Sequence, residues 1–151
     1  MKQSIQLSAL LILSLLLTGC SSLSPVKNEI PLVKGGLDIK PTNTNDTKLV
    51  IFNDSSVVGF GIDGTGRINV KLNDKGVAQL NIGRYTQVIV PKGKYQVDLE
   101  HLDMFHFTSQ HQIELVKPES FLMIYATPTS NKAELLSTLP QDFEQKYRPV
   151  E

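Results

Sequence analysis

Apolar and polar residues alternate along much of the chain after residue 47, the two-residue period of half-buried β-strands. The stretch 49–52 differs, because Leu-Val-Ile-Phe is continuously apolar, which is typical of a strand buried on both faces. Alternating stretches at 68–72 and 78–82 flank Asn73-Asp74-Lys75-Gly76, in which we expect Gly76 to adopt the left-handed conformation of a turn. The predicted hairpin pairs Leu72 with Ala78, Val70 with Leu80 and Ile68 with Ile82.

The same alternation continues on both sides of a Pro91-Lys92-Gly93 turn, which predicts a second hairpin from 88–90 and 95–99. Further strands are expected at 105–116, 120–127 and 133–139, and a short helix at 141–147 between two prolines. Strands at such regular spacing favour an all-β fold. We therefore predict a small antiparallel β-sandwich, transthyretin- or immunoglobulin-like in style, over residues 47–139, followed by a C-terminal tail at 140–151.

The first twenty residues have the organisation of a secretory signal. A short polar segment with Lys2 precedes the apolar stretch 7–17, which at about eleven residues is too short to span a bilayer. Leu17-Thr18-Gly19-Cys20 then resembles the lipobox of bacterial lipoproteins. That resemblance implies a signal peptide at 1–19, signal-peptidase recognition through Leu17, Thr18 and Gly19, and lipidation of Cys20. The alternatives are an ordinary signal peptide with a chance cysteine, or a buried apolar helix.

The residues directly after Cys20 indicate to which membrane the lipid-anchored chain is expected to be sorted. In enterobacteria-like sorting, Asp after the lipidated cysteine retains a lipoprotein in the inner membrane, and this chain has Ser21 and Ser22. The resemblance thus implies the outer membrane, facing the periplasm.

From 21 to 46 the chain lacks a clear period and is rich in Pro, Gly and Asn, so we predict a flexible tether over 20–46, with a loose edge strand around 30–39 as an option.

Charge and cysteine content exclude several classes of function. The chain has 151 residues with fifteen basic and fifteen acidic side chains, and loss of Lys2 with the signal peptide leaves a net charge of −1. A nearly neutral chain argues against nucleic acid as a partner, since phosphate neutralisation needs clustered Lys and Arg. Cys20 is the one cysteine, so we expect no internal disulfide and no cysteine nucleophile.

Residues 47–139 also resemble the small β-domains of bacterial lipoproteins of unknown function, related in style to PEGA domains. The resemblance lies in the strand 68–73, then Gly76, Leu80, Gly83 and Tyr85, and the strand–turn–strand segment 88–97. Lys92 stands where that pattern usually has a second Pro, and Asn-Asp-Lys-Gly replaces the commoner Asp-Gly-Lys turn. The resemblance implies a β-sandwich in the envelope and supplies no catalytic residue.

No candidate for catalysis or metal binding is specific. Residues 59–64 match G-x-G-x-x-G, but the alternating stretch 67–73 follows where a dinucleotide site needs a helix. His101, His106 and His111 are interpreted as surface or rim residues, since a structural zinc site would need cysteine partners. No G-x-S-x-G elbow occurs. We expect no metal, no cofactor and no enzymatic activity.

The segment 104–107 is apolar on both faces and combines Met with two aromatic residues. Its ordinary interpretation is core, and the functional hypothesis is an interaction edge formed by Met104, Phe105 and Phe107 that meets a partner or a lipid chain. Three functions stay open: a non-enzymatic binding or scaffolding module whose partner is another envelope protein, a periplasmic carrier of a small apolar ligand or lipid, and an envelope enzyme.

Overall fold

The computed structural model describes residues 23–56, 66–102 and 105–150, and within them the chain forms a two-layer β-sandwich. The predicted all-β sandwich is confirmed. The strands are β1 (Asp46–Asn53), β2 (Ile68–Leu72), β3 (Lys75–Leu80), β4 (Arg84–Pro91), β5 (Gly93–Leu102), β6 (His106–Leu115), β7 (Glu119–Thr127), β8 (Ser130–Leu136) and β9 (Arg148–Pro149), and the one described helix is α2 (Phe143–Lys146).

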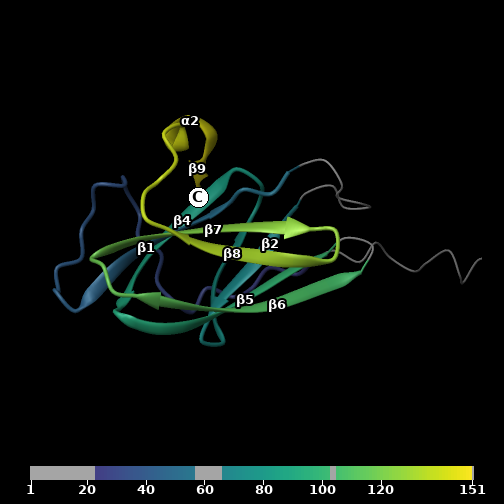
Figure 1. Ribbon diagram of the computed structural model, residues 1–151, viewed down its shortest axis with the longest axis horizontal. Helices are drawn as coiled ribbons and strands as arrows, with labels where there is room; N and C mark the ends of the chain where they lie inside the picture. Colours follow the sequence, from purple (N-terminus) through teal and green to yellow (C-terminus); the bar gives the residue numbers. More distant parts are fainter. Residues whose placement is uncertain (1–22, 57–65, 103–104, 151) are drawn as a thin grey trace, which may run out of the picture.

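The two sheets have the strand orders β8-β7-β1-β4-β9 and β3-β2-β5-β6 (Figure 1). Most neighbouring strands are antiparallel, but β1 pairs in parallel with β7, and β4 in parallel with β9. Hairpins within one sheet join β2 to β3, β5 to β6 and β7 to β8. The links from β1 to β2, β3 to β4, β4 to β5 and β6 to β7 each join strands of different sheets, whereas the segment from β8 through α2 to β9 returns to the same sheet.

Strand β1 is the centre of the five-stranded sheet and is buried on both faces, as the apolar run 49–52 predicts. Leu49 and Ile51 point into the core between the sheets. Val50 and Phe52 point the other way, into a second cluster on the outer face of the five-stranded sheet. Successive side chains of a strand alternate between faces, so both faces of β1 need an apolar cover.

The C-terminal segment covers part of that outer face. Phe143 and Tyr147 are buried, and their rings lie 5.2 and 4.8 Å from the ring of Phe52. The predicted terminal helix is present in a shorter form, as α2, and β9 follows it to pair with β4. Asp54 accepts hydrogen bonds of 2.5 Å from Lys146 and Tyr147. The residues predicted as a tail are therefore part of the folded domain.

The N-terminal segment is also packed, which corrects the flexible tether predicted over 20–46. The amides of Glu29 and Ile30 donate to the carbonyl of Gly76, at 2.8 and 3.2 Å, and Val33 donates to Gln87 at 2.7 Å. The edge strand suggested for 30–39 is reduced to one bridge, between Leu32 and Val88. Backbone and side-chain hydrogen bonds hold residues 23–46 although this segment has no apolar period, and residues 20–22 lie outside the described range.

The register of the first predicted hairpin is wrong by two residues. Ile68 lies opposite Leu80 and Val70 opposite Ala78. Asn73 and Asp74 adopt positive φ values of 48° and 64° and make a two-residue turn, tighter than the one expected, and a bulge follows Val70. Gly76, expected to be left-handed, instead allows close approach, because a Cβ there would lie 2.0 Å from the carbonyl oxygen of Lys27.

The second predicted hairpin is a corner between the sheets. The strands on either side of Pro91-Lys92-Gly93, β4 and β5, belong to different sheets. Gly93 has a φ of 152°, a conformation that residues with a Cβ rarely adopt, and turns the chain from one layer to the other. The Tyr95 hydroxyl donates to the Pro91 carbonyl at 2.7 Å, which fixes the corner.

Gly76→Ala tests the packing of the N-terminal segment. The added methyl collides with the Lys27 carbonyl, so we expect the free energy of unfolding to fall by about 1–3 kcal/mol, the usual cost of overpacking. Lys75→Ala, at an exposed neighbour, should change it by less than about 0.5 kcal/mol. Urea midpoints of the two variants decide, and equal midpoints would contradict the packed segment.

Tyr147 should make the protein sensitive to alkali. Burial is the largest cause that raises the pKa of Tyr147 from 10.0 to about 12, and the hydrogen bond to Asp54 is the second. The folded protein then keeps a proton that the unfolded chain loses, so stability present below pH 10 is lost as the pH rises towards 12. Urea midpoints measured across this range should fall, and the fall should be smaller in Tyr147→Phe. An equally steep fall in both proteins would refute the role of Tyr147.

Candidate binding site

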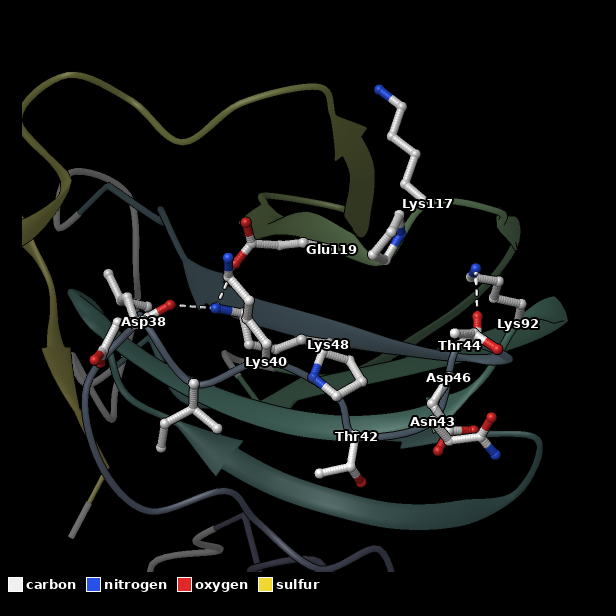
Figure 2. Close-up of a pocket in the computed structure, with 14 residues that line it drawn as sticks. Asp38, Lys40, Thr42, Asn43, Thr44, Asp46, Lys48, Lys92, Lys117 and Glu119 are labelled. Carbon is white, nitrogen blue, oxygen red and sulfur yellow. Dashed lines mark hydrogen bonds and ion pairs between the residues drawn. The ribbon is translucent and has the colours of Figure 1, made fainter.

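A cavity of about 660 Å³ lies at the end of the sandwich where β1 begins (Figure 2). We call it the lysine basin. The loop 37–44 forms one wall, and the rest comes from the start of β1, the corner at Lys92 and the turn 117–119 between β6 and β7. Four lysines line it, together with three carboxylates and four apolar side chains. These are Lys40, Lys48, Lys92 and Lys117; Asp38, Asp46 and Glu119; and Leu37, Ile39, Pro41 and Pro118.

Lys48 is the central residue of the basin. It lies on β1 two residues before Val50, so its side chain leaves the strand on the outer face, where only 2% of it stays exposed. Its ammonium group forms an ion pair with Glu119 and donates a hydrogen bond to the Leu37 carbonyl. A lysine is rarely buried unless it is paired, because loss of hydration is costly. Lys48 therefore fastens the loop 37–44 to both β1 and the start of β7.

The other lysines form the rim. Lys92 donates to the Thr44 carbonyl at 2.7 Å, which holds the loop to the β4–β5 corner. Lys40 is exposed on the loop, and Figure 2 shows Lys117 extending away from the buried ion pair. Four cations against three anions give the basin a small positive excess beside its four apolar side chains.

The basin combines charged, polar and apolar side chains. Besides the lysines, carboxylates and apolar residues, Thr42, Asn43 and Thr44 contribute neutral polar groups to its lining. The buried cation is already neutralised by Glu119. What the basin offers is a shaped, mixed polar and apolar surface on rigid strand ends.

His101 corrects the interpretation of the histidines as surface residues. It is 1% exposed, its ring is stacked on that of Phe107 at 5.0 Å, and its Nδ1 lies 2.7 Å from the Asn131 Oδ1. Asn131 belongs to β8 of the other sheet and also donates to the carbonyls of Leu99 and Phe107. His101 is thus part of a buried polar link that joins the two sheets.

The other two histidines lie around the same link. The Nε2 of His111 is 3.0 Å from the Ser109 hydroxyl and 3.2 Å from the Asn131 carbonyl oxygen. His106 is exposed, with its Nδ1 3.5 Å from a Glu100 oxygen. Across the described parts of the chain, no three His, Cys, Asp or Glu residues are placed to hold a metal ion together.

The two described residues of the candidate interaction edge, Phe105 and Phe107, differ in their exposure to solvent. Phe105 is 68% exposed at the tip of the β5–β6 hairpin, whereas Phe107 is half-buried against His101. The rings of Phe105 and Phe107 lie edge to face at 6.4 Å. Met104, the glycine motif 59–64, and the lipobox of Leu17, Thr18, Gly19 and Cys20 lie outside the described residues. An interaction at Phe105 stays a prediction.

Comparison of the chain with protein-family models, with curated proteins and with solved structures gives no match. In residues 23–56, 66–102 and 105–150, no helix has the length and apolar character needed to cross a bilayer. The interpretation of the site therefore rests on its own geometry.

Lys48→Met tests how the basin is held. Methionine keeps the buried stem but removes the donor to Leu37 and the partner of Glu119, so we expect the free energy of unfolding to fall by about 1–2 kcal/mol. Lys40→Met, on the exposed rim, should change it by less than about 0.5 kcal/mol. Denaturant unfolding measures both, and equal stability of the two variants would show that the buried ion pair does not fasten the loop.

Proposed function

We propose that the protein is a bacterial lipoprotein, anchored through Cys20, whose sandwich is a non-enzymatic binding module that presents the lysine basin to another envelope protein. The lipobox at 17–20 supports the anchor, and Ser21 and Ser22 support the outer membrane facing the periplasm. Acyl chains bind a bilayer strongly, since each buried methylene contributes about 0.8 kcal/mol.

The single observation that carries the proposal is that Leu23 and Ser24 are fixed at the end of the sandwich opposite the lysine basin. Leu23 is 3% exposed, and its carbonyl accepts a hydrogen bond from Gln79 at 3.2 Å. The Ser24 carbonyl accepts from Asn69 at 2.9 Å, so the segment is fastened beside the first residues of β2. Cys20 is three residues before Leu23, a distance of at most about 11 Å along an extended chain.

The lysine basin lies at the opposite end of the sandwich. Strand β5 begins at Gly93, beside the basin, and ends at Leu102, and His101 near that end pairs with Ile68 at the start of β2. Ten residues of β-strand span about 30 Å. A lipid on Cys20 would thus hold one end of the module near the membrane and direct the basin away from it, where a partner can reach it.

The interior supports a binding module over a carrier of apolar ligands. The core between the sheets is filled by tightly packed aliphatic side chains that are almost completely buried, among them Leu49, Ile51 and Leu122. A carrier that held its ligand between the sheets would need a cavity there, and a cavity in a core lowers stability. The lysine basin lies on the surface, so it does not lower stability by opening a cavity in the core.

Replacing the cysteine tests the anchor and the module together. In cells fed an alkyne fatty acid, the wild-type protein should be labelled and Cys20→Ser should not, because the acylated thiol is gone. With a photo-crosslinking residue at Thr42, on the rim of the basin, we expect a discrete adduct with one envelope protein. The adduct should be much weaker in the Cys20→Ser background, where the domain is no longer held at the membrane.

Lys94 supplies the matched control position. It is exposed near the start of β5, at the same end of the sandwich but outside the basin, so a crosslinker there should give no discrete adduct. Acyl labelling of Cys20→Ser would refute the anchor. Equal adducts from Thr42 and Lys94 would refute the basin as the binding surface.

A further inference from the structure

The end of the sandwich from which the chain leads back to Cys20 also carries the exposed ring of Phe105. We infer that the β5–β6 hairpin tip touches the membrane that holds the lipid anchor, with Phe105 inserted among the lipid headgroups. This inference rests on the proposed function and adds a second, non-covalent membrane contact to it. With two membrane contacts, the lipid anchor and Phe105, the domain would keep one orientation relative to the bilayer, whereas the anchor alone would let it rotate.

A chain of side-chain contacts places the tip beside the N-terminal segment. Asn69 donates to the Ser24 carbonyl at 2.9 Å and to the Glu100 carboxylate at 3.2 Å. The other oxygen of Glu100 lies 3.5 Å from His106, the residue that follows Phe105. Ser24 and the hairpin tip are therefore neighbours at one end of the molecule, and the same end is about 30 Å from the basin.

The strands that carry the tip are fixed relative to that segment. The pairing of β5 with β6 continues up to Leu102 and His106, immediately before and after the tip. Behind the tip, the stacked rings of His101 and Phe107 are fixed by Asn131 from the other sheet. Leu23 is fastened to the β2–β3 hairpin by Gln79. Leu23 and the strand residues on either side of the tip are therefore held in place relative to one another.

A lipid surface is the occupant that fits Phe105. Its ring is 68% exposed, and His106 beside it is polar and exposed, an arrangement that suits the membrane–water interface. The bilayer is also the surface that must be nearest, because Cys20 lies within about 11 Å of Leu23. The anchor makes this second contact intramolecular, which raises the effective concentration of lipid at the tip.

The absence of tryptophan from the sequence provides a clean test. Phe105→Trp places a single fluorescent reporter at the tip of the full, lipidated protein, reconstituted into phosphatidylcholine vesicles that contain a brominated phosphatidylcholine. Interfacial side chains lie about 5–10 Å into the headgroup region, so we expect a blue-shifted emission that loses at least about half its intensity to the bromine atoms. Val116→Trp is the matched control, since Val116 is 64% exposed between β6 and β7, at the basin end, and should be neither shifted nor quenched.

The outcomes separate the inference from the proposed function. Circular dichroism establishes that each variant is folded, and intact mass establishes that each carries lipid. A protein without lipid would refute the proposed function. A lipidated protein whose Phe105→Trp reporter is quenched no more than the Val116→Trp reporter would overturn the membrane contact alone. Protection of the Phe105→Trp reporter from acrylamide by an added envelope protein, without quenching by brominated lipid, would overturn it in favour of a protein partner.

Discussion

The burial of β1 on both faces is the constraint on which the rest of the structure depends. Leu49 and Ile51 fill the space between the sheets, and Val50 and Phe52 require a second cover on the outer face. Burial of each such side chain contributes about 1.5–3 kcal/mol, so an uncovered outer face would forfeit a large part of the stability of a small domain. The segments before β1 and after β8 supply that cover, and for this reason neither of them is a free tail.

The same constraint accounts for the lysine basin. Lys48 shares the outer face of β1 with Val50, but it lies near the beginning of the strand, beyond the aromatic cover of Phe143 and Tyr147. The loop 37–44 closes over it there and supplies the Leu37 carbonyl, and Glu119 arrives on the parallel neighbour β7. The basin is the space left between that loop and the strand ends, so its shape follows from how β1 is covered.

The strands, the terminal helix and the double burial of residues 49–52 could be predicted, because alternation and apolar runs record which faces are buried. Alternation does not show which strands pair with each other. The pattern around Pro91-Lys92-Gly93 therefore predicts a hairpin, although β4 and β5 belong to different sheets. The N-terminal packing depends on backbone groups such as the Gly76 carbonyl, which no side-chain pattern reveals. Lys48 gave one signal, a charge directly before an apolar run, but its partner Glu119 lies 71 residues away in the sequence.

His101 shows why the polar residues of a strand are hard to interpret from sequence. It follows the alternation of β5 onto the inward face, where a histidine is acceptable only with a partner, and that partner, Asn131, comes from the other sheet. The link braces the end of the sandwich opposite the basin, where β5 turns into β6 and β7 into β8. Lys48 and His101 thus brace the two ends of the sandwich separately, one through an ion pair and the other through a hydrogen bond, and the core between the sheets is left to apolar side chains.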